Sequence, residues 1–158
     1  MFSNHGALIK HQHEIEGINS RLDGIQAAIL SAKLKYILDW NERRISHANH
    51  YNKLLSNVTQ VIIPKLIPNG KHVFHLYVIR VKNRTALQSF LNSKGISTGI
   101  HYPTPLPFLK AYDYLKHKKE DFPVSKNHQN KILSLPIYPE LTKDQIHYVV
   151  DNIAEFYN

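Results

Sequence analysis

The clearest strand pattern in the sequence is Val73-Phe74-His75-Leu76-Tyr77-Val78-Ile79-Arg80-Val81. Its β-branched and aromatic residues suit a pleated, half-buried backbone, so we predict a strand over 73–81. A helix is predicted next, because leucine and phenylalanine recur at helical spacing until Gly95, which is typical of a residue that ends a helix. The segment 96–102 again has strand composition, and Pro103 ends it.

The rest of the carboxy-terminal half adds short elements around these strands. We predict small helices over 108–115 and 124–133 and an edge strand over 135–138, which its prolines keep from the sheet centre. Thr142 and Gln145 have the spacing of a capping box and open a closing amphipathic helix. A sheet of about three strands covered by helices makes this an α+β domain.

A longer periodic segment precedes the domain. Apolar residues recur every three or four positions, at Leu22, Ile25, Ile29, Ala32, Tyr36 and Trp40. They predict one helix over 21–56, with Ser20 near its start and a length of roughly 50 Å. A helix of that length is typical of a bridge between two domains or two subunits.

Composition narrows the classes of function. The 158 residues contain 20 Lys and Arg against 12 Asp and Glu, a formal charge of +8, which suits an anionic partner. No recognition-helix pattern supports nucleic acid, and the run Lys116-His117-Lys118-Lys119 fits a solvated loop. No apolar run approaches the roughly 20 residues that span a bilayer, and the start is no signal peptide, so we expect no membrane contact and a cytoplasmic location.

Several kinds of reactive site find no support in the sequence. Cysteine is absent, and six of the eleven histidines form three close pairs, at 11 and 13, 47 and 50, and 72 and 75; each pair offers two ligands where zinc uses three or four. Neither a Gly-x-Ser-x-Gly elbow nor a glycine-rich phosphate loop is present. We therefore assign no catalytic residue and no metal ligand in this sequence.

Three segments could bind a ligand. The first, 16–23, contains Asn19 and Arg21 near the predicted helix start, which suits either an anion site or an ordinary solvated helix start. The second, 97–107, ends a strand with His101 and Tyr102 before three prolines, and it suits either a rigid binding loop or a structural connection. The third, 133–142, fits a strand, turn and helix cap better than a site.

These segments together resemble the DegT/DnrJ/StrS family of nucleotide-sugar aminotransferases, which depend on pyridoxal phosphate (PLP). The resemblance covers essentially the whole chain. It is carried by Asn4-His5-Gly6, Gly17-Ile18-Asn19-Ser20-Arg21-Leu22-Asp23-Gly24-Ile25-Gln26-Ala27-Ala28-Ile29-Leu30, Lys33-Leu34, Trp40-Asn41, His72-Val73-Phe74-His75-Leu76-Tyr77-Val78-Ile79-Arg80, Gly95-Ile96-Ser97-Thr98-Gly99-Ile100-His101-Tyr102-Pro103, Ala111-Tyr112 and Ile132-Leu133-Ser134-Leu135-Pro136-Ile137-Tyr138-Pro139-Glu140-Leu141-Thr142.

The resemblance implies the carboxy-terminal part of a fold-type-I aminotransferase. Family members work as homodimers with the active site at the dimer interface, and they move an amino group from glutamate to a nucleotide-linked keto sugar. Their Schiff-base lysine lies on a large α/β domain, before the triplet that Asn4-His5-Gly6 matches, and Lys10 matches no part of that lysine motif. We therefore expect these residues to be inactive by themselves and to pair as a homodimer or with the large domain.

The resemblance also implies roles for single residues. Asn19 is expected to reach the PLP phosphate of the other subunit, and Arg21 a phosphate or the sugar. His101 and Tyr102 are expected to bind hydroxyls or the diphosphate of a nucleotide-diphosphate sugar. His75 and Tyr77 are weaker candidates for ligand binding, since packing of the predicted strand explains both residues as well.

We divide the chain accordingly. Residues 1–20 are expected to be a remnant of the large domain with a loop to the dimer interface, 21–56 the long interdomain helix, and 57–158 the small α+β domain of a fold-type-I PLP aminotransferase. An alternative function remains open, namely a non-catalytic nucleotide-sugar-binding module or partner subunit.

Overall fold

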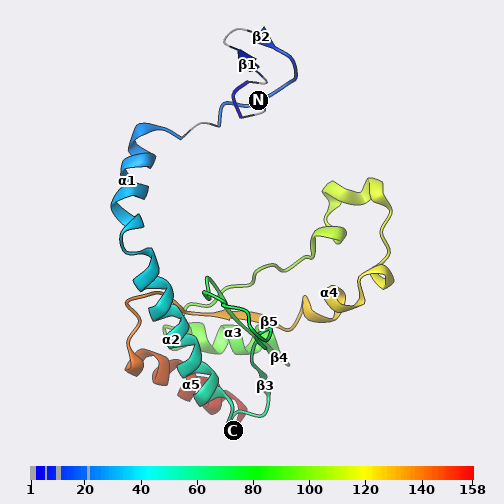
Figure 1. The fold of residues 1–158 in the computed structure, drawn as a ribbon. Helices are drawn as coiled ribbons and strands as arrows, with labels where there is room; N and C mark the ends of the chain where they lie inside the picture. The colour runs from blue at the N-terminus through cyan, green and yellow to red at the C-terminus, as the bar shows by residue number, and fades with distance from the viewer. Residues whose placement is uncertain (1–2, 6, 10–11, 21) are drawn as a thin grey trace. The chain divides into compact units, whose positions relative to one another are not determined.

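The computed structural model describes residues 3–5, 7–9, 12–20 and 22–158 (Figure 1). The chain forms two compact units, residues 1–38 and residues 39–158. The division falls inside the segment 21–56, and the functional partition at 20 and 56 stays a prediction.

The first unit contains a small antiparallel pair of strands, β1 (Ala7–Ile9) and β2 (Gln12–His13). The segments before and after this pair are also joined, because Asn4 and Asn19 form an antiparallel bridge. Helix α1 (Gly24–Leu34) follows, and none of its residues is buried.

The helix predicted over 21–56 is in fact two helices. Helix α1 ends at Leu34, and α2 runs over Ile37–Leu55. Between them the Tyr36 N–H donates to the Lys33 carbonyl at 3.0 Å, a three-residue spacing that tightens the last turn and interrupts the helical hydrogen-bond ladder. Neither glycine nor proline occurs at the break, so no local residue signals it.

The second unit is built on one antiparallel sheet of three strands. Strand β4 (Tyr77–Val81) lies between β3 (Val61–Ile62) and β5 (Ile132–Leu135). Ile79 on β4 pairs with Leu133 on β5. The prediction of an α+β domain with about three strands is confirmed.

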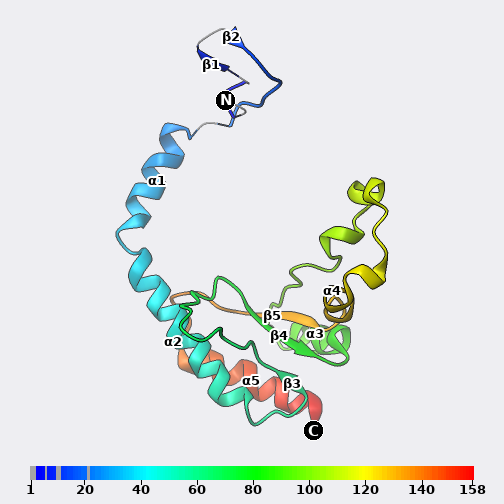
Figure 2. The ribbon, with the colours of Figure 1, turned by 45° about the vertical axis from the view of Figure 1, so that its right-hand side comes forward.

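Helices α2, α3 (Arg84–Ser93) and α5 (Lys143–Tyr157) surround the sheet (Figures 1 and 2). Along β4, alternate residues are buried, which is the two-residue period of a strand. The helices supply the other side of the core, with fully buried side chains at Tyr51, Leu55, Leu87, Leu91, Ile146 and Ile153. Thr142 and Gln145 form the predicted capping box, and Gly95 ends α3 with a positive φ of 75°.

Several predicted boundaries are wrong. The strand predicted over 73–81 begins only at Tyr77, because Phe74 takes a positive φ of 49° and turns its ring into the core. The segment 96–102 is no strand and makes a single bridge, between Gly99 and Ser134. The predicted helix 124–133 is the shorter α4 (Pro123–His128), and β5 occupies Ile132–Leu135 instead of 135–138, because pairing with β4 outweighs local preference.

The segment between α3 and α4 forms three short 3₁₀ helices, η1 (Leu106–Phe108), η2 (Lys110–Leu115) and η3 (Lys119–Asp121). In both ribbon views this segment projects away from the sheet (Figures 1 and 2). Within the described part of the chain, no helix has the length and apolar character needed to cross a bilayer.

Candidate functional site

His101 follows two residues after Gly99, which forms an isolated antiparallel bridge with Ser134 on β5. Its Nδ1 lies 2.9 Å from the Oγ of Ser134, a residue of β5 that is only 5% exposed. Gly99 and Ser134 exchange two backbone hydrogen bonds, of 3.0 and 2.7 Å. The His101 ring is therefore attached to the most ordered part of the fold, although the residue itself is exposed.

Tyr102 completes this candidate site. Its ring meets the His101 ring edge to face, with centroids 5.5 Å apart, and the residue is 71% exposed. A hollow of about 390 Å³ lies beside it, lined by Tyr102, Pro103, Thr104, Pro105, Leu106 and Leu109. An apolar wall next to a phenol and an imidazole suits a sugar, whose C–H faces pack on rings while its hydroxyls form hydrogen bonds.

Asn19, the predicted cofactor contact, belongs to the other unit. Its backbone is extended and bridged to Asn4, and the adjacent Ile18 carbonyl accepts from the His5 N–H at 3.0 Å. The Ser20 N–H donates to the Ser3 carbonyl at 2.9 Å, so both neighbours of Asn19 are held by backbone bonds. The side chain is exposed on this short ladder.

The start of α1 differs from the prediction. The helix begins at Gly24 with Asp23 as its N-cap, and the Asp23 carboxylate accepts from the Gln26 N–H at 2.8 Å. A carboxylate therefore already occupies the position where an anion was expected to bind. Asn19 lies four residues before this cap, and Arg21 lies outside the described residues.

His75 and Tyr77, the weaker candidates, serve the structure. Tyr77 is fully buried, stacks on Tyr51 at 4.9 Å and donates from its hydroxyl to Asn52 Oδ1 at 2.6 Å. Burial raises the pKa of Tyr77, so the hydroxyl stays a donor. The carbonyl of His75 lies 3.5 Å from Arg44 Nη1, which places this backbone against α2.

Several of the described histidines contact other aromatic rings. His50 on α2 faces His147 on α5, with ring centroids 5.0 Å apart. Burial, followed by the neighbouring His147, lowers the pKa of His50. Among the residues that the structure describes, no group of three His, Cys, Asp or Glu side chains could share a metal ion.

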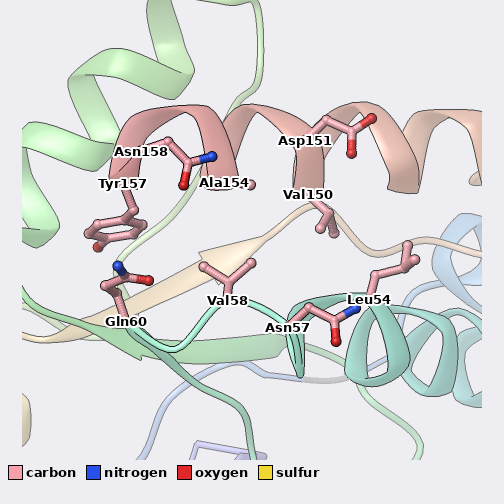
Figure 3. Close-up of a pocket in the computed structure, with 9 residues that line it drawn as sticks. All are labelled: Leu54, Asn57, Val58, Gln60, Val150, Asp151, Ala154, Tyr157 and Asn158. Atoms are coloured by element: carbon pink, nitrogen blue, oxygen red, sulfur yellow. The ribbon is translucent and has the colours of Figure 1, made fainter.

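A second hollow, of about 290 Å³, lies between the end of α2 and the end of α5 (Figure 3). In the figure Val58 and Val150 point toward each other across it, and the Asp151 carboxylate points away from Val58. Its lining comes from 54–60 and 150–158, which carry no recognisable motif, so the sequence offered no signal for it.

Two contacts with acidic side chains lie in and just after the lysine-rich run, one from the backbone of Lys118 and one from the side chain of Lys126. The Lys118 N–H donates to Asp121 Oδ2 at 2.8 Å, and Lys126 pairs with Glu120 at 3.0 Å. Both side chains of that pair are largely exposed, so it contributes little to stability. The geometry agrees with a solvated loop.

Comparison with known proteins gives one consistent result. The profile of the DegT/DnrJ/EryC1/StrS aminotransferase family matches residues 1–154. The "Pleiotropic regulatory protein" of Geobacillus stearothermophilus is 43% identical over 155 residues, covering 97% of this chain and 42% of that protein. The dTDP-3-amino-3,6-dideoxy-alpha-D-galactopyranose transaminase of Aneurinibacillus thermoaerophilus is 39% identical, covering 97% of this chain and 41% of that protein.

Solved structures agree with the sequence relatives. The structure of DesV from S. venezuelae, in complex with a ketimine intermediate, superposes with a TM-score of 0.89 at 35% identity and covers 99% of this chain and 42% of DesV. A DegT DnrJ EryC1 StrS aminotransferase from Brucella abortus gives a TM-score of 0.84 at 33% identity, with 98% and 41% covered. The chain thus spans about two fifths of the length of the proteins it matches.

Proposed function

Since the chain belongs to the DegT/DnrJ/EryC1/StrS aminotransferase family, we propose that it is the carboxy-terminal part of a PLP-dependent enzyme that moves an amino group from glutamate to a nucleotide-linked keto sugar. The observation that carries the proposal is the family match over residues 1–154. Relatives named as dTDP-sugar transaminases at 39% and 35% identity support the substrate class. The formal charge of +8 suits a diphosphate ligand.

In this proposal the His101–Tyr102 site holds the sugar nucleotide. The exposed phenol and imidazole are the groups that meet hydroxyl or diphosphate oxygens, and the hollow beside Tyr102 receives the sugar ring. Neither residue is assigned a proton transfer. They bind and orient the ligand, and correct positioning of a substrate raises the reaction rate.

The proposal gives Asn19 a contact with the cofactor. An exposed amide on a braced, extended backbone fits one hydrogen bond to a phosphate, and Arg21 would add a guanidinium. When bound, PLP supplies the electron sink of transamination, and the lysine that attaches it belongs to the large domain in this family.

A dimer is part of the same proposal. Helix α1 carries apolar side chains that are more than half exposed, at Ile25, Ile29, Leu30 and Leu34. An apolar stripe of this kind marks an interaction surface. We propose that a second copy of the protein covers it, with Asn19 and Arg21 reaching across, and that the protein works in the cytoplasm.

Titration of this chain with dTDP-glucose, followed by amide NMR shifts, tests sugar-nucleotide binding at the His101–Tyr102 site. We expect saturable shifts around 101–109, and a weakening of about tenfold in Tyr102→Ala. Tyr114→Ala is the matched control, because Tyr114 is equally exposed, at 73%, on the same projecting segment. No binding at millimolar ligand contradicts the proposal.

A second experiment separates the transaminase from the alternative, a binding or partner subunit. Mixed with PLP alone, this chain is expected to give no shift of the cofactor's absorbance. A family-length protein that ends in these residues is expected to convert glutamate to 2-oxoglutarate when a nucleotide-linked keto sugar is present. Sugar-nucleotide binding without such conversion favours the partner subunit, a reading that fits the regulatory name of the Geobacillus relative.

A further inference from the structure

Two residues without an assigned role hold the His101 ring in one orientation. Ser134 contacts Nδ1 through its buried hydroxyl, at 2.9 Å. Its own backbone is fixed on both sides, because it pairs with Val78 on β4 and with Gly99 on the other edge of β5. The hydroxyl thus has little freedom to move, and it makes a rigid anchor for the imidazole.

Gly99 limits the ring from below. A Cβ at this position would lie 2.6 Å from His101 Cε1 and 3.3 Å from Nδ1, so the imidazole occupies the space of a side chain. The backbone of Gly99 lies outside the left-handed region, so the contact with the ring is what a larger residue would disturb, and the His101 ring would have to move. With Nδ1 in contact with Ser134 and the Cε1 edge of the ring directed at Gly99, the orientation of the His101 imidazole is restricted on two sides.

The hydrogen-bond inventory also sets the tautomer. A buried hydroxyl needs an acceptor for its hydrogen, and within the described residues the partner of Ser134 Oγ is His101 Nδ1. If the hydroxyl donates to Nδ1, the ring hydrogen lies on Nε2. In that tautomer the Nε2–H is a donor for an oxygen of a ligand.

We propose that Ser134 and Gly99 are positioning residues that lock His101 with Nδ1 as acceptor and present Nε2–H as a fixed donor to a hydroxyl or phosphate oxygen of the ligand. The inference rests on the proposed function only for the identity of that ligand. A donor that is already oriented loses less entropy on binding than a freely rotating ring, so affinity rises without a new contact.

Ring ¹⁵N NMR of the ligand-free chain at a pH where His101 is neutral tests the lock. We expect a pyridine-type Nδ1 signal, a pyrrole-type Nε2 signal and a nuclear Overhauser effect between Gly99 Hα and His101 Hε1. Ser134→Ala should average the two nitrogen signals, Ser134→Thr should restore them, and Gly99→Ala should abolish the Overhauser effect. Ser97→Ala, an exposed hydroxyl on the same segment, should change none of these signals.

A pyrrole-type Nδ1 in the unmodified chain, or a tautomer that Ser134→Ala leaves unchanged, overturns the inference. A second arm adds UDP. We expect the His101 Nε2 signal to move, and Ser134→Ala to weaken UDP binding by about threefold to tenfold while its amide spectrum stays folded. A locked ring in a chain that binds neither UDP nor dTDP-glucose supports the positioning role and counts against the proposed function.

Discussion

Removal of one buried hydroxyl tests how the loop after β5 is held. The ring of Tyr51 is fully buried on α2, and its hydroxyl donates to the Pro136 carbonyl at 3.0 Å. Tyr51→Phe keeps the ring and its stacking on Tyr77, with centroids 4.9 Å apart, and deletes only this bond. The carbonyl of the half-buried Pro136 then loses this donor, which comes from a fully buried side chain.

The expected cost follows from burial. Loss of the bond and of the carbonyl's partner should lower the free energy of unfolding by about 2 kcal/mol. Tyr148→Phe is the matched control, because the Tyr148 hydroxyl also donates to a carbonyl at 3.0 Å, that of Lys94, but the residue is 52% exposed. Water replaces that bond, so the control should cost less than about 0.5 kcal/mol.

Urea unfolding followed by far-ultraviolet circular dichroism measures the difference. With a slope of about 2 kcal/mol per molar, Tyr51→Phe should move the midpoint down by about 1 M and Tyr148→Phe by about a quarter of that or less. Equal shifts, or a larger shift for Tyr148→Phe, would refute the reasoning that burial of the Tyr51 bond determines its contribution.

Two other perturbations have defined outcomes. Thr142→Ala removes the capping box, in which Thr142 and Gln145 exchange bonds of 3.2 and 2.9 Å. In the same urea assay it should lower the free energy of unfolding by about 1 kcal/mol. The control Thr85→Ala, at an exposed position, should lower it by less than about 0.5 kcal/mol. Burial, followed by the Arg80 guanidinium 2.6 Å away, lowers the pKa of His128 below 6.5, so its contribution to stability is present above pH 6.5 and is lost as the pH falls through the lowered pKa. The urea midpoint should therefore fall more between pH about 7.5 and about 5.5 in the unmodified chain than in His128→Gln, which keeps an acceptor for Arg80; parallel curves would exclude this coupling.

Much of the fold could be predicted because its signals are local. The alternation of buried and less buried side chains along 77–81 is typical of a strand that packs on one face. The spacing of Thr142 and Gln145 is typical of a helix start in any surroundings. The break at Tyr36 could not be predicted. It coincides with the three-residue hydrogen bond from the Tyr36 N–H to the Lys33 carbonyl, and neither glycine nor proline marks the position. The shortening of 96–102 to one bridge depends on where β5 lies, which local composition does not contain.

The candidate site divides in the same way. His101 and Tyr102 stood out as polar residues between a strand-like segment and three prolines, and the structure brings them together beside a hollow. The sequence did not indicate that Ser134 contacts His101, because Ser134 lies 33 positions after His101 in a segment with the pattern of a strand and turn.

From the sequence alone came the family resemblance, the α+β class, the strand at 77–81, the helices α3 and α5, and the choice of His101 and Tyr102 as candidates. These properties depend on residue types and on spacings within about ten positions, which a chain carries before it folds. Only the tertiary structure decided that α1 begins after Asp23, that the helix breaks at Tyr36, and that Gly99 and Ser134 hold His101. The start and the break of the helix depend on local bonds that no residue type signals, from Gln26 N–H to Asp23 and from Tyr36 N–H to Lys33. The contact between Ser134 and His101 joins segments 33 positions apart, which come together only when residue 99 pairs with β5.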